Sequence, residues 1–241
     1  MQWNPWAKPL SSWRRQRHSA WGAMLDQQEI LLAALSLQQT GGVRVVVFEH
    51  LHAPEGLVHL SERDDWLVQT LRGLGNHLPS RLRTMVLAIS EDRCRQGVLD
   101  GVAHDPRRMH AEVQLEAAAA WGVEPEAVGF DFRCDDDGAS AEGTQRVHWA
   151  ACLREELQQW RQHARSAGWR LPVVEPEGQA AQRAAMCLRG DTLQQWAESP
   201  QDWQFSREPQ RTWAEVDWSR LKDGPMWKPL VACGAALGAL C

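Results

Sequence analysis

Residues 21–49 read WGAMLDQQEILLAALSLQQTGGVRVVVFE, and this stretch decides the fold. It contains three apolar runs separated only by short polar or glycine-containing links: Trp21–Asp26, Ile30–Leu37 and Val43–Glu49. The third run is rich in valine, a β-branched residue that favours strands, and the links are short enough to be tight turns. The stretch therefore predicts three strands joined by tight turns.

The segment that follows adds a helix and a fourth strand. Between Asp65 and Leu78, apolar side chains recur at helical spacing, and Pro79 lies just beyond the last of them. Arg83–Ser90 (RTMVLAIS) is a nearly continuous apolar run, which is typical of a buried strand. The first part of the chain therefore predicts the order β-β-β-α-β.

A second unit with both helices and strands is predicted after residue 105. Pro at the first turn and Gly122 after the end frame a helix over Pro106–Trp121, which is a common arrangement at helix termini. The remaining patterns predict strands over Ala127–Cys134, Arg146–Cys152 and Trp169–Val174, and helices over Leu153–Ala167, Gly178–Leu188 and Leu230–Leu240. This mixture predicts an α+β protein with helices packed over sheets.

Composition narrows the class of protein. The chain has 241 residues, a formal net charge of -5 and 44% hydrophobic residues, enough to bury a sizeable core. A nucleic-acid-binding protein normally presents a basic face, so we expect no nucleic-acid partner. The six cysteines form no CxxC pair and no signal peptide is recognisable, so we expect reduced thiols in the cytoplasm. The apolar run 229–241 is too short to span a bilayer.

Several small clusters invite a chemical interpretation, but none forms a convincing active site. Asp135–Gly138 begins like a calcium loop but has no glutamate at the twelfth position. His50 with His52, and His104 with His110, lack the helical spacing of a specific metal site, so we expect surface histidines and no metal. Cys94 lies between two arginines that would lower its thiol pKa. An enzyme of another class would need Cys94, His104 and an acid within hydrogen-bond reach.

The order of these elements resembles PilM, the actin-like assembly protein of type IV pili, and its short HofM-type relatives in competence operons. The resemblance lies in the opening hairpin Gly22–Leu35 and in four later segments: Arg83–Ser90, Phe130–Phe132, Val147–Arg154 and Gly168–Pro176. It implies an α+β fold consisting of a reduced actin-like (ribonuclease H-like) lobe, an inserted small α+β domain and a second lobe that is largely missing.

This resemblance also implies a domain organisation. Residues 1–20 form a flexible basic and Trp-rich tail, and 21–90 together with 228–241 form the actin-like lobe. The inserted domain spans 91–188, and a Trp-rich segment, 189–227, connects it to the last helix.

In actin-like ATPases the first hairpin holds phosphate with small residues and carries an aspartate near the metal. Here Met24 stands where the acidic residue is expected, and the turn Asp26–Glu29 brings two acids toward the phosphate position. Backbone N–H groups can approach a phosphate closely only at small residues. We therefore expect no ATPase activity, no catalytic residues and no bound cofactor; the alternative is a residual ATP-binding switch protein.

For the PilM family, the resemblance implies that an N-terminal cytosolic peptide of PilN binds in a groove between the first lobe and the inserted domain. It places the candidate partner-binding residues on the helix after Pro106 and the strand after Ala127: Arg108, Glu112, Leu115, Glu116, Phe130 and Phe132. Glu112 and Glu116 lie one turn apart and suit a basic peptide; the alternative is an ordinary solvated helix face. The expected partner is a PilN-like inner-membrane pilus protein, which would hold this chain peripherally at the inner membrane.

Overall fold

The computed structural model describes most of the chain after the N-terminal tail. The described residues are 19–25, 28–39, 41–57, 59–103, 105–134, 144–190, 199–212, 216, 221–222 and 224–240. Residues 1–18 of the predicted tail, the Asp135–Gly138 stretch and part of the Trp-rich segment 189–227 lie outside these residues, whereas Ser19 and Ala20, which we had placed in the tail, belong to the first strand.

The larger of two sheets has six strands in the order β8-β4-β1-β2-β3-β9. Strands β1 (Ser19–Leu25), β2 (Glu29–Leu37) and β3 (Val43–His52) form the predicted antiparallel meander. Strand β4 (Thr84–Ile89) pairs parallel with β1, and β8 (Arg170–Pro176) pairs parallel with β4. The short β9 (Gln204–Phe205) pairs antiparallel with β3 at the opposite edge.

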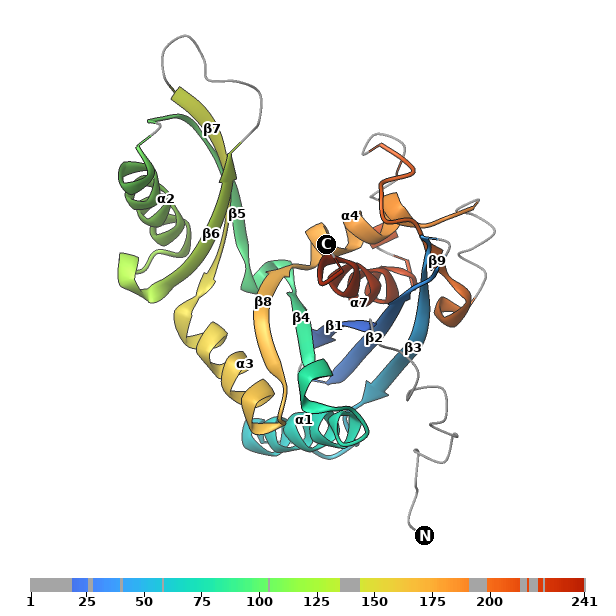
Figure 1. Cartoon of the computed structure of the whole chain (residues 1–241). Helices are drawn as coiled ribbons and strands as arrows, with labels where there is room; N and C mark the ends of the chain where they lie inside the picture. The colour runs from blue at the N-terminus through green and yellow to red at the C-terminus, as the bar shows by residue number, and fades with distance from the viewer. Residues whose placement is uncertain are drawn as a thin grey trace.

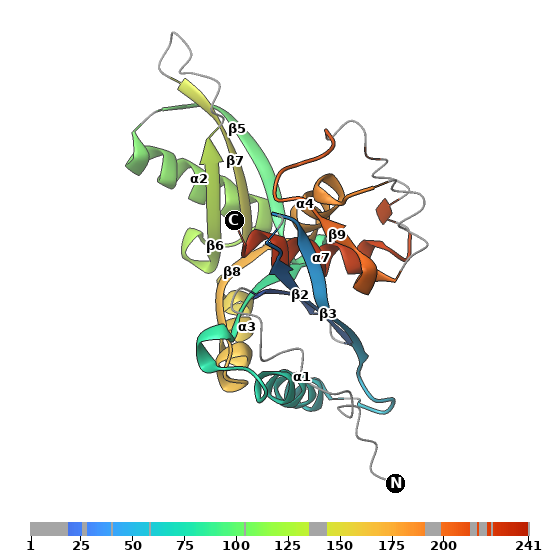
Figure 2. The same ribbon diagram turned by 45° about the vertical axis from the view of Figure 1, so that its right-hand side comes forward.

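Helices cover both faces of this sheet (Figures 1 and 2). One face packs against α1 (Leu60–Gly75) and α3 (Arg154–Ser166), and the other against α4 (Glu177–Cys187) and α7 (Trp227–Gly238). Along β2, Ile30, Leu32 and Ala34 face α1, while the alternate residues face α7. A strand buried on both faces must be apolar at nearly every position, which explains the continuous apolar run of β2.

The smaller sheet has three antiparallel strands in the order β5-β7-β6. These are β5 (Arg95–Ala103), β7 (Thr144–Leu153) and β6 (Val128–Cys134), and α2 (Pro106–Trp121) covers one face. The Asp105 side chain caps α2 by accepting a hydrogen bond from the Arg107 N–H (3.0 Å). Gly122, at φ 67°, ends the helix in the left-handed conformation that favours glycine. Short 3₁₀ helices complete the chain at Ser80–Leu82, Glu91–Arg93, Pro125–Ala127 and Pro200–Asp202.

The structure corrects the predicted division of the chain. The small sheet ends at Leu153, whereas β8 and α4, which we had placed in the inserted domain, belong to the large sheet and its covering layer. Strand β5 was not predicted. The described part of 189–227 does more than connect, because Trp203 and Phe205 are fully buried in the core between the sheet, α4 and α7.

Within the described residues, no helix combines the length and the apolar character that crossing a bilayer requires. Helix α7 has 12 residues, most of them buried, and packs between the sheet and α4.

Candidate functional site

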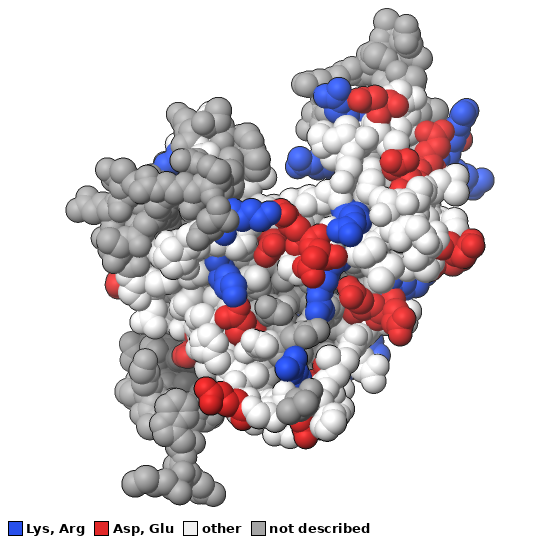
Figure 3. All heavy atoms as spheres, turned by 180° about the vertical axis from the view of Figure 1, so that it is seen from behind, with Lys and Arg blue, Asp and Glu red and all other residues white. Residues whose placement is uncertain are grey.

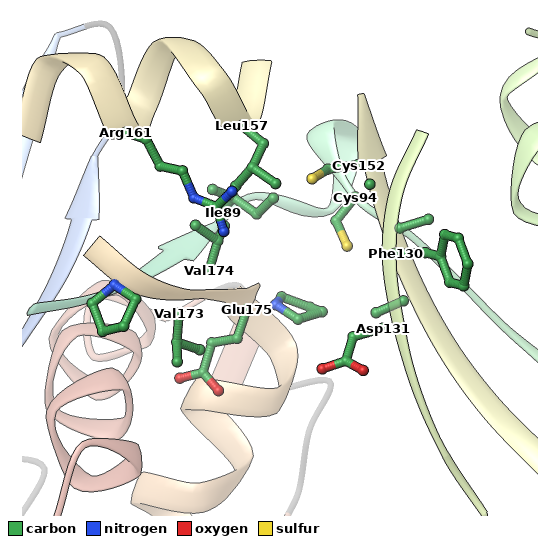
Figure 4. A pocket seen from close by; sticks show the side chains of 15 residues that line it. Ile89, Cys94, Phe130, Asp131, Cys152, Leu157, Arg161, Val173, Val174 and Glu175 are labelled. Carbon is green, nitrogen blue, oxygen red and sulfur yellow. The ribbon is translucent and has the colours of Figure 1, made fainter. Parts of the chain in front are cut away.

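A groove separates the small sheet from the β8 edge of the large sheet (Figure 4). It consists of two adjoining hollows that share the following lining residues: Asp131, Ala150, Val173, Val174, Glu175 and Pro176. One hollow extends toward Cys94, Cys152, Leu157 and Arg161, and the other toward Gln96, Val98, His148 and Gln179. Because the two hollows share these lining residues, they form a single elongated groove.

The first wall of the groove is the face of the small sheet that α2 leaves uncovered. In β7, Val147, Trp149 and Ala151 pack in the hydrophobic cluster beneath α2, whereas His148 and Ala150 between them line the groove. Side chains alternate between the two faces of a strand, so the open face carries the small and polar members of the sequence. This wall of the groove is therefore partly polar and can remain in contact with water.

The second wall is strand β8, which lies at the edge of the large sheet and pairs only with β4 among the described strands. Five consecutive residues, Pro172–Pro176, line the groove, so the strand presents its edge there rather than one face. Val173 is 46% exposed, and Val98 on the opposite wall is 49% exposed. An exposed strand edge flanked by exposed apolar side chains is a surface to which another extended segment can pair.

Two carboxylates point into the groove from opposite walls (Figure 4). Glu175 is neutralised locally, because both of its oxygens accept hydrogen bonds from Arg183 (2.9 and 2.7 Å). Arg183 also donates to the carbonyl of Gly234 (2.8 Å), which fixes the pair against α7. Asp131 is exposed and has no ion-pair partner among the described residues; its Oδ1 accepts a hydrogen bond from the Phe132 N–H (2.8 Å). Asp131 is therefore the uncompensated negative charge of the groove.

Cys94 and Cys152 form one end of the groove (Figure 4). Burial, with a smaller contribution from the neighbouring Cys152, raises the pKa of the Cys94 thiol to about 12. The sequence had suggested the opposite direction. That prediction was wrong because the desolvation of the thiol outweighs the charge of Arg95. His104, its suggested catalytic partner, lies outside the described residues.

The structure separates the predicted partner-binding residues into two groups. Arg108 and Glu112 form an exposed ion pair along α2 (Nε to Oε1, 3.0 Å), and Leu115 is 60% exposed. These side chains and Glu116 do not line the groove, since α2 lies on the far side of the small sheet (Figure 1). Helix α2 therefore does not border this groove, and a partner contact by these four residues stays a prediction.

Phe130 and Phe132 lie on β6, and this strand does border the groove. Their rings, however, pack against the cluster beneath α2, and the Phe130 ring contacts His110 (ring centroids 4.7 Å apart). Figure 4 shows the Phe130 ring turned away from the Asp131 carboxylate. The side chain that β6 presents at this point of the groove is therefore Asp131, one residue from each predicted aromatic.

The carboxyl ends of the parallel strands β1, β4 and β8 are the usual ligand position in a sheet of this kind. Here that region contains buried acids. Glu29 is 7% exposed and forms an ion pair with Lys228, at the start of α7. Glu177, also 7% exposed, accepts a hydrogen bond from the Glu91 N–H (3.2 Å), and burial raises its pKa. Both carboxylates are therefore already engaged by groups of this chain, Glu29 by Lys228 and Glu177 by the Glu91 N–H.

The charged surface elsewhere has no dominant sign on the face shown in Figure 3, where acidic and basic side chains are interspersed. Long-range steering by one sign of charge is therefore not a feature of this face. Recognition in the groove must depend on individual groups such as Asp131.

Comparison with known proteins supports the fold. No protein family model and no curated protein sequence matches the chain. Among solved structures, the PilM-PilN type IV pilus biogenesis complex matches with a TM-score of 0.55 and 18% identity. The fold is actin-like. The match covers 70% of this chain but 51% of the PilM-PilN chain, so this chain spans about half the length of that structure.

A second solved structure is the cytoplasmic domain of EpsL, an inner membrane component of the type II secretion system of Vibrio cholerae. It matches with a TM-score of 0.48 and 13% identity, over 68% of this chain and 59% of that one. At these identities the likeness concerns the fold. The match to the PilM-PilN structure, at a TM-score of 0.55, agrees with the predicted reduced actin-like lobe with an inserted small domain.

Proposed function

We propose that this chain is a cytosolic scaffold of a type IV pilus or competence machine. In this proposal the groove holds the N-terminal cytosolic segment of a PilN-like inner-membrane protein. The observation that carries it is the open groove between an uncovered sheet face and the free edge of β8, in a chain whose fold resembles that of the PilM-PilN complex. The chain itself would stay on the cytoplasmic side and contact the membrane through its partner.

The shape of the groove favours an extended segment over a folded domain. The β8 edge offers backbone N–H and C=O groups between Pro172 and Pro176, which themselves have no N–H to donate. Val98 and Val173 provide apolar contacts on opposite walls. In strand addition, backbone hydrogen bonds contribute affinity and side-chain pockets contribute specificity.

At the position of Asp131 the groove favours a basic side chain on that segment, while Arg133 and Arg161 are the cationic members of the same lining. Asp131 has no cationic partner among the described side chains, whereas Glu175 already binds Arg183 through both oxygens. A lysine or arginine of the partner would pair with Asp131, and the bound segment would strengthen this pair by excluding water from it.

We propose further that the scaffold works without nucleotide hydrolysis. Met24 is buried and apolar at the position where the family resemblance calls for an acid. The nearby carboxylates of Glu29 and Glu177 are buried and already engaged by Lys228, Glu91 and Trp227. The alternative, a residual ATP-binding switch, predicts that ATP with magnesium raises the melting temperature through preferential binding to the folded state. The scaffold proposal predicts no such shift.

The direct test is calorimetric titration of the purified chain with a synthetic peptide that represents the N-terminal cytosolic segment of its PilN-like neighbour. We expect micromolar binding that Asp131→Arg or Val173→Asp weakens at least tenfold, because the first change places like charges opposite each other and the second puts a charge into an apolar contact. The matched controls are Glu116→Arg and Leu115→Asp, which make the same kinds of change on α2, outside the groove.

Each outcome has a meaning. Weakening by the groove variants alone, with unchanged melting temperatures, supports the proposal. If only the α2 variants weaken binding, the partner binds the face of α2 that was predicted from the sequence and not the groove. No detectable heat from a folded chain would contradict the scaffold proposal.

A further inference from the structure

The carboxylate of Glu29 meets two histidines at the end of the large sheet, well away from the groove. Glu29 is the first residue of β2 and His52 the last residue of β3, and the antiparallel register pairs them directly. His50 lies two residues earlier on β3 and therefore projects from the same face as His52. The register of the hairpin thus brings Glu29 together with two histidines that follow it by more than twenty positions in the sequence.

The three ligand-type atoms are already close. His50 Nε2 lies 2.7 Å from Glu29 Oε2, and His52 Nδ1 lies 4.0 Å from the same oxygen. All three atoms fall within 4.8 Å of one another. The two imidazole rings also lie side by side, with centroids 4.3 Å apart. A ligand could reach the cluster, because the side chains of His50 and His52 are 39% and 68% exposed.

The Glu29 carboxylate is held in place from its other side. Its Oε1 pairs with Lys228 in the first turn of α7, and the Glu29 side chain is 9% exposed. This arrangement leaves Oε2 directed toward the histidines. Groups that hold a ligating side chain through its second polar atom fix its orientation in known metal sites. The Lys228 charge opposes a cation nearby, and its pairing with the carboxylate limits this effect.

We propose that Glu29, His50 and His52 form a binding site for a divalent transition metal of the zinc type. Imidazole nitrogens with one carboxylate oxygen favour Zn²⁺ and its neighbours over Mg²⁺ or Ca²⁺, which prefer oxygen ligands. In a tetrahedral zinc site the ligand atoms lie about 3.3 Å apart, given metal–ligand bonds of about 2.0–2.1 Å. Small rotations of the two exposed imidazoles achieve that spacing. The fourth position remains open to water.

The site is independent of the proposed peptide groove, so each can be tested without the other. The first experiment is calorimetric titration of the untagged, full-length chain with Zn²⁺. We expect binding in the micromolar range or tighter, and a Zn²⁺-dependent rise in melting temperature. The double variant His50→Gln/His52→Gln should weaken binding more than tenfold and abolish the rise. Both histidines are exposed, so this variant should fold.

The matched control is His77→Gln, which removes an exposed histidine far from the cluster in sequence. Retained affinity in the control, with loss in the double variant, supports the site. Absence of zinc binding by the natural chain would overturn the proposal. Equal affinity in the natural chain and the double variant would also overturn it, because the zinc would then be bound by other groups such as the cysteines.

Discussion

The two sheets of this protein differ in how many of their faces are covered. The large sheet is covered on both faces, by α1 and α3 on one side and by α4 and α7 on the other. One face of the small sheet is covered by α2, while its second face meets α3 at one end, near Leu157, and otherwise forms a wall of the groove. An antiparallel sheet tolerates one solvated face, whereas a sheet with parallel pairing is normally buried on both. The difference indicates which sheet forms the core and which is available for binding.

The side chains follow this difference in coverage. At the center of the large sheet, β2 places Leu31 and Leu32, both fully buried, on opposite faces. In the small sheet, β6 alternates aromatic residues beneath α2 with the exposed Asp131 on the open face. The open face therefore carries a charged side chain on β6 and has exposed apolar side chains at its edges, where a partner can bind.

The largest expected effect tests how tightly the covered sheet is packed. Gly234 of α7 lies directly against the backbone of Ala180 in α4, so a side chain there would overlap main-chain atoms that cannot move aside. We expect Gly234→Val to cost more than about 3 kcal/mol of unfolding free energy, because forced overpacking against backbone exceeds the usual cost of core enlargement. Urea denaturation measures this change.

The control for this variant lies on the open face of the small sheet. A methyl group at Gly129 would meet the end of the Leu157 side chain at 3.2 Å and the Cys152 carbonyl oxygen at 4.0 Å, an ordinary contact distance. Gly129→Ala should therefore change the unfolding free energy by less than about 1 kcal/mol. If both variants were equally destabilised, the contrast between a fully packed sheet and an open one would not hold.

The junction between the sheets provides the second prediction. Burial raises the pKa of Cys94 from 9.0 to about 12, so its thiolate fraction at neutral pH should fall about a thousandfold. In the native protein, alkylation of Cys94 by iodoacetamide should be far slower than that of the half-buried Cys134. Peptide mapping by mass spectrometry after timed labelling distinguishes the two sites. Equal labelling rates in the folded state would show that the junction opens readily.

Some of this organisation was predictable from the sequence, because local patterns determine it. The order β-β-β-α-β follows from apolar runs and tight links, and α2 has the bounds that its proline and glycine predicted. Strand β5 was not predicted because Gly97 and Gly101 interrupt its apolar pattern and its pairing shifts register between Leu99 and Val102. The placement of β8 in the large sheet depends on pairing with β4, about eighty residues earlier, which no local pattern reveals.

The candidate site was predictable only in part. The sequence pointed to β6 but favoured Phe130 and Phe132, whose rings are in fact packed beneath α2. A strand alternates faces, so the aromatic residues belong on the helix-covered side and the charged residue between them belongs on the open side. The sequence therefore indicated that Asp131 lies on the open side. It did not indicate the opposing wall at Val173, because only the tertiary fold brings β8 opposite the small sheet.

The smallest expected effect concerns Glu177, at the carboxyl ends of the parallel strands. Burial raises its pKa, so the folded state favours the protonated carboxyl more than the unfolded state does. The stability contributed by this group is fully present below its unfolded pKa and is lost as pH rises through its folded pKa. Glu177→Gln has no titration there, so its stability relative to the natural chain should increase with pH across this range.

Thermal unfolding of both proteins between acidic and neutral pH measures the Glu177 effect. If the stability of Glu177→Gln relative to the natural chain instead fell as pH rises, hydrogen bonds from Glu91 and Trp227 to the ionised carboxylate would outweigh its burial. That result would mean that the region at the carboxyl ends of the parallel strands stabilises negative charge, which would favour the ATP-binding alternative.

The central claim is that an extended partner segment binds between the open face of the small sheet and the edge of β8. Hydrogen–deuterium exchange of the chain, with and without the PilN-like peptide, tests it most directly. The account predicts slower exchange in β6 and β8, residues 128–134 and 170–176, with no change in α2, residues 106–121. Protection confined to α2, or absent from both groove walls under saturating peptide, would contradict it.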